Sequence, residues 1–188
     1  MIKLLVGLGN PGRNYEKTRH NAGFLFLDEL IRETPGVWSV RSEFEGLFSD
    51  TMLAGKRLML LKPTTFMNGS GRSVAKVAKY YKIDPEEILV VHDELDFNPG
   101  LIKLKKGGGH AGHNGLRDII LQLDSKGFYR LRVGIGRPPA GKVVADFVLS
   151  APSKLECTEI TRALDVGLSY VASILDGDLS VVMNKINS

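Results

Sequence analysis

Apolar runs and amphipathic stretches alternate along the chain. The continuous apolar runs Ile2–Leu8 and Ile88–Val91 are typical of strands that are buried on both faces. Apolar residues recur at helical spacing in Asn21–Glu33 and Ser70–Lys82, which predicts two amphipathic helices. This alternation predicts an α/β fold, with a twisted, mixed and mostly parallel β-sheet flanked by helices.

Further elements complete the predicted sheet and its covering layers. Val37–Leu61 has the pattern of short strands with a hairpin turn at Ala54–Lys56, and Leu101–Lys105 alternates like an edge or mixed-sheet strand. The other predicted elements are a helix at Leu116–Leu123, a strand at Tyr129–Ile135 and one long helix at Lys154–Leu175 with Leu155 in its apolar stripe. No repeat or low-complexity linker divides the sequence, so residues 1–188 are expected to form a single domain.

The composition is that of an ordinary globular protein. Of the 188 residues, 43% are hydrophobic and 24% are charged, which excludes a disordered chain. The single cysteine, Cys157, cannot form an internal disulfide, which favours a reducing compartment. The apolar run at the N-terminus is too short for a signal peptide or a membrane span, and we therefore expect a cytoplasmic protein.

Basic residues are concentrated in one part of the chain. The sequence has 25 basic and 21 acidic residues and a net charge of +4, whereas residues 101–142 hold nine basic and two acidic residues, a net +7 that leaves −3 elsewhere. This excess is typical either of a polyanion-binding face or of solubilising surface lysines, and the charge alone does not separate the two.

Polar and glycine-rich loops follow the predicted strands. The five loops are Gly7–His20, Lys62–Gly71, His92–Gly100, Gly107–Gly115 and Arg130–Pro138. Ligand sites of open α/β sheets lie at the carboxyl ends of the strands, so these loops are expected to converge on one site.

The first of these loops contains a G-x-G-x-x-G pattern at residues 7–12, a spacing found in dinucleotide-binding proteins. That fingerprint needs a helix to begin at once, but residues 13–19 are polar and show no apolar period. Pro11 also removes a backbone donor from the loop. We therefore expect no nicotinamide, flavin or other cofactor.

Two residues are candidates for acid–base chemistry. His20 lies where a helix is predicted to start, and Asp93 follows the strand Ile88–Val91. An aspartate at a strand end can accept a hydrogen bond from one ring nitrogen of a histidine and leave the other free as a base. The alternative is a structural histidine and a turn-capping aspartate.

The glycine-rich loop Gly107–Gly115 contains His110 and His113, whose spacing also raises the question of a zinc site. No third ligand of suitable spacing is evident, and catalytic zinc normally takes three protein ligands. We therefore expect no metal.

Three asparagines, Asn10, Asn68 and Asn114, adjoin glycine or proline at strand-to-helix junctions. An amide group both donates and accepts hydrogen bonds, which suits recognition of a peptide unit or an ester. Helix capping or turn formation explains the same positions equally well.

Five motifs follow one another along the chain: Gly7–Gly12 with Tyr15 and Thr18–Asn21, then Lys62–Gly71, His92–Asp96, Gly107–Gly115 and Arg130–Gly136. Together, in this order and at these separations, they resemble the bacterial peptidyl-tRNA hydrolase family. The resemblance covers Val6 to about Pro138, whereas Trp38–Leu53 and the tail from Ala151 carry no motif.

The resemblance implies an esterase that hydrolyses the ester between a peptide and the 3′ ribose of tRNA, without metal or cofactor. His20 matches the general base that activates water, and Asp93 matches the partner that orients it. The substrate-binding positions are matched by Asn10, Tyr15, Phe66, Met67, Asn68, His113 and Asn114. The tRNA-binding positions are matched by Lys103, Lys105 and Arg132. For Phe66 and Met67, ordinary core packing is an equally good explanation.

The expected partner is the acceptor stem and 3′ end of peptidyl-tRNA, with no DNA and no membrane, and the chain is expected to be a monomer. Two other classes stay open. One is a peptidase or amidase that uses the same histidine–aspartate pair, and the other is a non-catalytic RNA-binding protein that keeps only the basic patch.

Overall fold

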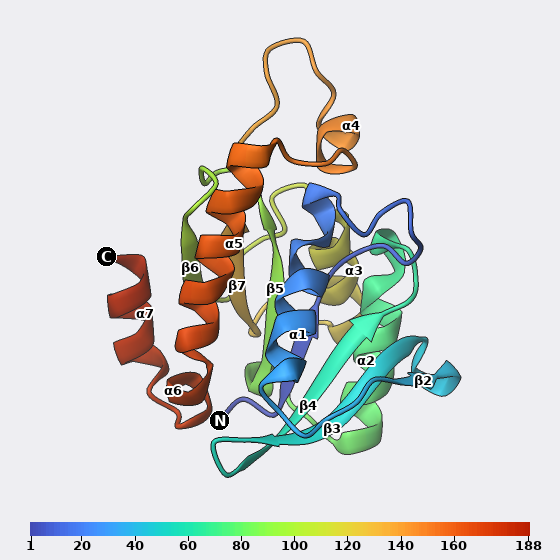
Figure 1. Ribbon diagram of the computed structural model, residues 1–188. Helices are drawn as coiled ribbons and strands as arrows, with labels where there is room; N and C mark the ends of the chain where they lie inside the picture. Colours follow the sequence, from blue (N-terminus) through green and yellow to red (C-terminus); the bar gives the residue numbers. More distant parts are fainter.

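A seven-stranded sheet runs through the computed structural model, which describes all 188 residues (Figure 1). The strands are β1 (Leu4–Gly7), β2 (Ser39–Arg41), β3 (Gly46–Leu53), β4 (Lys56–Pro63), β5 (Ile88–Glu94), β6 (Ile102–Lys106) and β7 (Tyr129–Gly134). Their order is β2-β3-β4-β1-β5-β7-β6, with β4, β1, β5 and β7 parallel and the strands at both edges antiparallel. The mixed, mostly parallel sheet predicted from the sequence is confirmed.

Helices cover both faces of this sheet (Figure 1). The α-helices are α1 (Ala22–Arg32), α2 (Ser70–Tyr81), α3 (Asn114–Leu123), α4 (Val144–Val148), α5 (Lys154–Ser169), α6 (Val171–Leu175) and α7 (Leu179–Asn187). Short 3₁₀ helices are η1 (Arg19–Asn21), η2 (Ser42–Phe44), η3 (Met67–Gly69) and η4 (Pro85–Glu87). None of the helices has the length and apolar character needed to span a bilayer.

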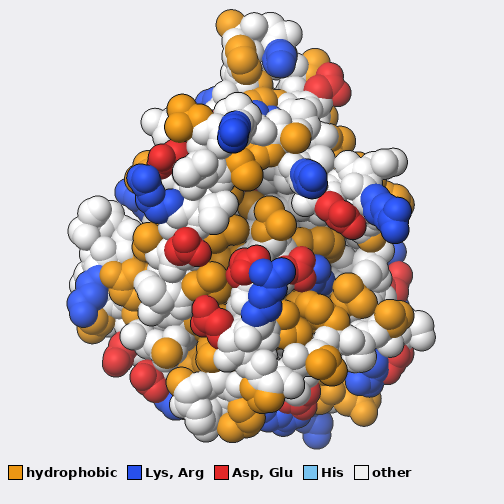
Figure 2. All heavy atoms as spheres, in the orientation of Figure 1, with side chains coloured by type: hydrophobic (Ala, Val, Ile, Leu, Met, Phe, Trp, Pro, Cys, Tyr) orange, Lys and Arg blue, Asp and Glu red, His pale blue; other side chains and the backbone are white.

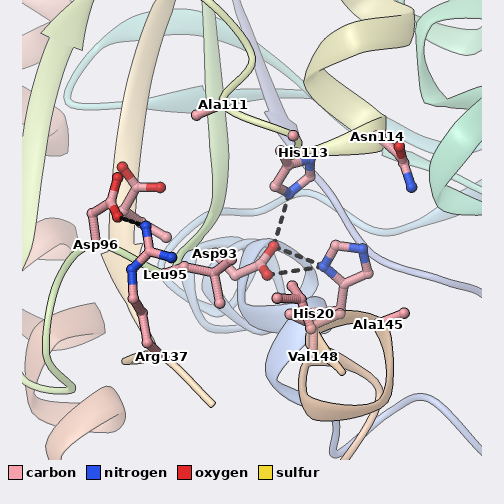
Figure 3. Close-up of a pocket in the computed structure, with 13 residues that line it drawn as sticks. His20, Asp93, Leu95, Asp96, Ala111, His113, Asn114, Arg137, Ala145 and Val148 are labelled. Atoms are coloured by element: carbon pink, nitrogen blue, oxygen red, sulfur yellow. Dashed lines mark hydrogen bonds and ion pairs between the residues drawn. The ribbon is translucent and has the colours of Figure 1, made fainter. Parts of the chain in front are cut away.

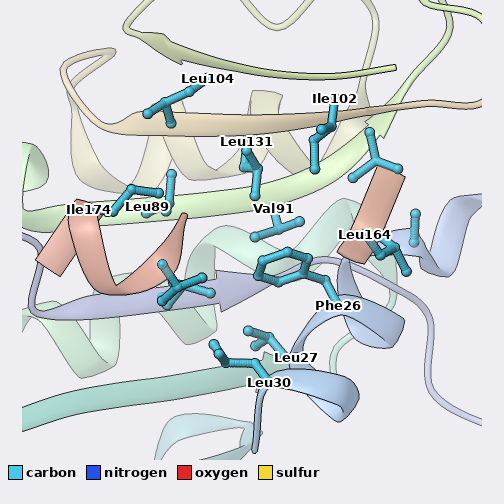
Figure 4. Close-up of a cluster of buried hydrophobic side chains, with 14 of the residues drawn as sticks. Phe26, Leu27, Leu30, Leu89, Val91, Ile102, Leu104, Leu131, Leu164 and Ile174 are labelled. Carbon is cyan, nitrogen blue, oxygen red and sulfur yellow. The ribbon is translucent and has the colours of Figure 1, made fainter. Parts of the chain in front are cut away.

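The central strands are buried on both faces because alternate residues feed two separate cores. Leu5, Leu89 and Val91 pack with α1, α5, α6 and α7 on one face, in the cluster shown in Figure 4. Leu4 and Val6 pack on the other face with α2 and α3. A parallel strand covered by helices on both sides needs apolar residues at every position, which explains the continuous runs in the sequence.

Most predicted elements are confirmed, but the prediction of one long helix at Lys154–Leu175 is wrong. It is two helices, α5 and α6, separated at Tyr170, whose N–H donates to the carbonyl of Gly167 at 3.1 Å in a tighter turn. The apolar spacing continues across the break, so periodicity did not reveal it. Leu155, predicted to lie in the apolar stripe, is 73% exposed.

Two further boundaries bear on the site. The strand predicted to end at Val91 continues as β5 to Glu94, so Asp93 belongs to a rigid strand and not to a loop. The helix predicted to begin at Leu116 begins at Asn114, with His113 as its N-cap. The short helices α4 and α7 were not predicted.

The glycines after β1 serve close packing. A Cβ atom on Gly7 would lie 2.3 Å from the carbonyl oxygen of Gly23, and one on Gly9 would lie 2.6 Å from the ring of Phe24. The loop is pressed against the start of α1, and its glycines are needed for that contact. No helix begins directly after residues 7–12, since η1 begins at Arg19 and α1 at Ala22, so the helix that a dinucleotide fingerprint requires at this place does not follow the loop.

Candidate active site

Of the five loops predicted to converge, four contribute residues to one cavity at the carboxyl ends of the parallel strands, and Lys62–Gly71 borders a neighbouring cavity. The first cavity has a volume of about 440 Å³ and is lined by His20, by Asp93 at the end of β5, by His113 and Asn114 at the start of α3, and by residues of α4 (Figure 3). Since these segments are distant in sequence, the sheet itself brings the site together.

The pair formed by His20 and Asp93 lies at the centre of the cavity. Nδ1 of His20 lies 2.9 Å from Oδ2 and 3.0 Å from Oδ1 of Asp93, whose side chain is only 2% exposed. A buried carboxylate accepts, so Nδ1 carries the proton and Nε2 of neutral His20 is an unprotonated base. In Figure 3 the second ring nitrogen of His20 turns away from Asp93, toward the side on which Asn114 lies.

His113 is a second imidazole on the same carboxylate. Its Nε2 donates to Oδ1 of Asp93 at 2.8 Å, while its Nδ1 accepts from the backbone N–H groups of Gly115 and Leu116 at 3.1 and 3.3 Å. One nitrogen donates and the other accepts, so this hydrogen-bond network assigns the neutral tautomer to His113. The charge of Asp93 is thus left to stabilise a positive charge on His20.

Electrostatics favour an ionised Asp93 between the two imidazoles. Burial opposes ionisation, but electrostatic attraction to the two imidazoles and the hydrogen bonds that they donate lower the pKa of Asp93 below its usual range. Burial likewise disfavours the charged form of His20, yet the adjacent Asp93 carboxylate raises the pKa of His20 above its ordinary 6.5.

His92 is a third imidazole, which contacts the backbone of Asp93 and the ring of His113. Its Nδ1 donates to the backbone carbonyl of Asp93 at 2.7 Å, and its ring centroid lies 5.1 Å from that of His113. Complete burial, with His113 close by, lowers the pKa of His92 to about 3, so this ring stays neutral.

The three candidate asparagines are placed differently. Asn114 lines the cavity with His20, whereas Asn10 lines a neighbouring cavity of about 450 Å³ and Asn68 lies exposed in η3. The N–H of Met67 donates to Oδ1 of Asn10 at 2.7 Å, and Asn21 pairs with the backbone of Asn10 through bonds of 2.8 and 2.9 Å. These bonds fix the amide of Asn10 and leave its Nδ2 free to donate to a ligand.

The apolar candidates also separate. Phe66 is 60% exposed and meets the half-buried ring of Tyr15 edge-on, with centroids 6.2 Å apart. Met67 is 4% exposed and belongs to the core beneath α2 and α3. Core packing therefore describes Met67 well, while Phe66 and Tyr15 present an aromatic surface.

The basic candidates share one face of the sheet edge. Ile102 and Leu104 of β6 belong to the core under α5 and α7, so Lys103 and Lys105 point to the opposite face. Arg132 of β7 is paired with Lys103 in the antiparallel register, and both cations lie against Phe97, at 4.7 and 5.4 Å from the ring centre.

The expectation of no metal was argued from His110 and His113, but the structure brings His113 to different neighbours. Ligand atoms of His20, Asp93 and His113 lie within 4.8 Å of one another and could in principle hold a metal ion. The same atoms are joined to one another by the hydrogen bonds from the two imidazoles to Asp93, and these bonds account for the close approach of the three side chains.

Several functional contacts were missed by sequence reasoning. His113 was predicted to bind substrate, and its bond to Asp93 was not foreseen, because it depends on how α3 sits on β5. The role of Asn21 in holding Asn10, and the wall formed by α4, were likewise not predicted. A strong signal was available only for Asn21, which lies in the motif beside His20.

An imidazole base, a buried carboxylate and free amide donors around one cavity are the parts of a hydrolytic enzyme site. Comparison with known proteins identifies the kind of hydrolytic enzyme. The peptidyl-tRNA hydrolase family model matches residues 4–188. A peptidyl-tRNA hydrolase of Methylococcus capsulatus is 51% identical over 187 residues, covering all of both chains, and one of Marinomonas sp. is 51% identical over all of this chain and 97% of the relative.

The crystal structure of peptidyl-tRNA hydrolase from Acinetobacter baumannii superposes with a TM-score of 0.96 at 45% identity, over 100% of this chain and 95% of that chain. The chain therefore belongs to the peptidyl-tRNA hydrolase family, whose members hydrolyse an ester bond.

Proposed function

We propose that this protein hydrolyses peptidyl-tRNA with His20 as the general base and Asp93 as its orienting partner. The observation that carries the proposal is the contact of 2.9 Å between Nδ1 of His20 and the buried carboxylate of Asp93. It leaves Nε2 as the nitrogen that takes a proton from water, and the water oxygen then attacks the ester carbonyl. The same proton can be returned to the ribose oxygen when the carbon–oxygen bond breaks.

The amides supply the polar contacts that such a substrate needs. Asn114 borders the His20 cavity, and Asn10, fixed by Asn21 and Met67, offers its Nδ2 from the adjacent cavity. We assign Asn68 and Asn114 to the peptide main chain and to polarisation of the ester carbonyl, and Asn10 to positioning of His20 or of the terminal ribose. Requiring a peptide amide spares aminoacyl-tRNA, because a site built for a hydrogen bond rejects an analogue that lacks it by about 10⁴ or more.

The experiment that tests this function measures release of free tRNA from peptidyl-tRNA, with aminoacyl-tRNA and a peptide amide assayed in parallel. We expect turnover of peptidyl-tRNA only. Equal cleavage of the peptide amide would favour a peptidase, and tRNA binding without release of the peptide would favour a non-catalytic RNA-binding protein.

The activity is expected to fall on the acid side at a pH above that of an ordinary histidine. Neutral His20 is the active form, and its pKa is raised above 6.5 by Asp93, so kcat/KM drops as the pH decreases through that raised value. A pH–rate profile of kcat/KM checks the sign, and an acid limb centred below 6.5 would contradict it.

We further propose that Lys103, Lys105 and Arg132 bind phosphates of the tRNA acceptor stem. Their common face at the β6–β7 edge lies beside the loop that leads to His113, and each contributes a positive charge without reading bases. The single cysteine, Cys157, is free and exposed, which supports a reducing compartment such as the cytoplasm.

Replacing Lys105 by alanine is expected to weaken tRNA binding and to reduce the slope of log K against log salt by about one unit. Hydrolysis of a minimal peptidyl ester should change little. Lys185→Ala, on α7 at the other face of β6, is the matched control. A salt slope identical to that of the wild type would remove Lys105 from the tRNA-binding face.

A further inference from the structure

Arg19, the residue before His20, is a buried cation that takes no part in the His20–Asp93 pair. Its side chain is only 8% exposed, and its charge is balanced by Glu156 of α5, with Nη2 donating to Oε2 at 2.9 Å. Burial opposes ionisation of Glu156, but hydrogen bonds from Ser153 and the charge of Arg19 together lower its pKa. The pair is therefore ionised at neutral pH.

The same guanidinium fastens η1 to the segment that ends α4. Its Nη1 donates to the carbonyl of Phe147 at 3.2 Å and to the carbonyl and hydroxyl oxygens of Ser150 at 3.3 and 2.6 Å. The Arg19 Cζ atom lies 4.1 Å from the centre of the Phe147 ring. The backbone N–H of Arg19 also donates to the Ser150 carbonyl, at 3.1 Å. Backbone and side chain of one residue thus hold the same turn.

That turn carries a wall of the active-site cavity. Val144, Ala145 and Val148 of α4 line the cavity with His20, and Figure 3 shows Ala145 and Val148 beside the imidazole. The long loop before α4 projects from the top of the molecule in Figure 1. The contacts of Arg19 therefore link this wall to the segment that carries the base.

The other side of Arg19 faces away from the chemistry. It lines a second cavity of about 410 Å³ between α1 and α5, whose remaining lining includes Ala22, Leu25 and Ile160. Figure 2 shows apolar side chains gathered on this face between the two helices. Arg19 lines this cavity and not the His20 cavity, so it does not touch a substrate bound beside His20.

We propose that Arg19 is a positioning residue, which locks His20 and the α4 wall into one rigid unit through its fork of hydrogen bonds to Phe147, Ser150 and Glu156. This inference rests on the proposed role of His20. Displacement of a reacting group by about 1 Å can cost about 100-fold in rate, so loss of the fork acts on kcat. The basic face at β6 and β7 is untouched, so tRNA affinity is unaffected.

The test compares Arg19→Met with Arg162→Met. The second variant breaks an exposed ion pair within α5, the helix that carries Glu156. In this pair Arg162 lies 3.3 Å from Glu159, and the variant is expected to behave as wild type. Arg19→Met is expected to lower kcat for peptidyl-tRNA by about 10- to 100-fold with KM within about twofold. Arg19→Lys keeps the ion pair with Glu156 but not the fork, and should recover only part of that loss.

A readout independent of catalysis separates this inference from the proposed function. NMR titration of the His20 imidazole is expected to show its pKa falling toward the ordinary value of about 6.5 in Arg19→Met, because the contact with Asp93 loosens. The substitution alters none of the other titratable groups around His20: Asp93 and His113 form the hydrogen-bonded network, His92 lies behind it, and Glu94, Asp96 and Arg137 line the same cavity. Failure of His20 as the base would appear as an active His20→Ala variant and would leave this titration interpretable.

Ser150→Ala provides a milder variant in case Arg19→Met does not fold. It removes only the hydroxyl that accepts from Nη1 at 2.6 Å and leaves the buried charges paired. We expect a decrease in kcat of about three- to tenfold with unchanged tRNA binding. Wild-type kcat and an unshifted His20 titration, in folded Arg19→Met or in Ser150→Ala, would overturn the proposal.

Discussion

Replacing His20 by alanine is expected to lower kcat for peptidyl-tRNA by about three orders of magnitude or more. The side chain that leaves is the one whose Nε2 is free to take a proton, because its Nδ1 is committed to Asp93 at 2.9 Å. Affinity for tRNA should stay near that of the wild type, since the candidate phosphate-binding residues lie on β6 and β7. The measurement is a single-turnover assay of tRNA release together with tRNA binding by titration.

His110→Ala is the matched control for this loss. His110 lies in the glycine-rich loop, where its Nδ1 accepts from the N–H of Gly112 at 3.0 Å, and it does not contact Asp93. We expect this variant to retain turnover within about threefold of the wild type, the range of an ordinary surface substitution. Turnover by His20→Ala at the wild-type rate would exclude His20 as the base.

Replacing Asp93 by asparagine is expected to lower kcat by about 10³ to 10⁴ through the wrong histidine tautomer. His113 cannot change tautomer easily, because its Nδ1 accepts from Gly115 and Leu116, so it continues to donate from Nε2 to the remaining carbonyl oxygen. The new amide nitrogen then faces Nδ1 of His20 and donates to it. The proton of His20 is thereby placed on Nε2, the nitrogen that must be free.

The predicted loss of activity in Asp93→Asn is tested by measuring kcat and the pH dependence of kcat/KM. Asp93→Asn should lose the acid limb that reflects the raised pKa of His20, because the carboxylate that raises it is gone. Asp146→Asn, an exposed carboxylate in the first turn of α4, is the control and should leave both unchanged. A profile for Asp93→Asn identical to that of the wild type would show that the carboxylate does not act on His20.

The sheet could be predicted from the sequence because its central strands are continuous apolar runs that nothing but double-sided burial explains. The proximity of His20 and Asp93 could also be predicted. His20 ends the loop that follows β1 and Asp93 lies at the end of β5, and parallel strands present their carboxyl ends at one edge of the sheet. That argument gives proximity but no hydrogen-bond geometry.

The contacts that depend on tertiary packing could not be predicted. The bond from His113 to Asp93 requires the start of α3 to lie beside the end of β5, and no periodicity in the sequence encodes that contact. The break at Tyr170 preserves the apolar stripe, so a pattern of spacing cannot detect it. The burial of Arg19, which lies inside the motif Thr18–Asn21, was not predicted, and only the fold shows that Arg19 is packed against Phe147 and Glu156.

The position of the proton on His20 in the free protein tests the central idea most directly. NMR of labelled imidazole nitrogens, recorded above the His20 pKa, distinguishes the two neutral tautomers. We predict that Nδ1 carries the proton and that Nε2 is bare, as the contact with Asp93 requires. A proton on Nε2 in the wild-type protein would contradict the account.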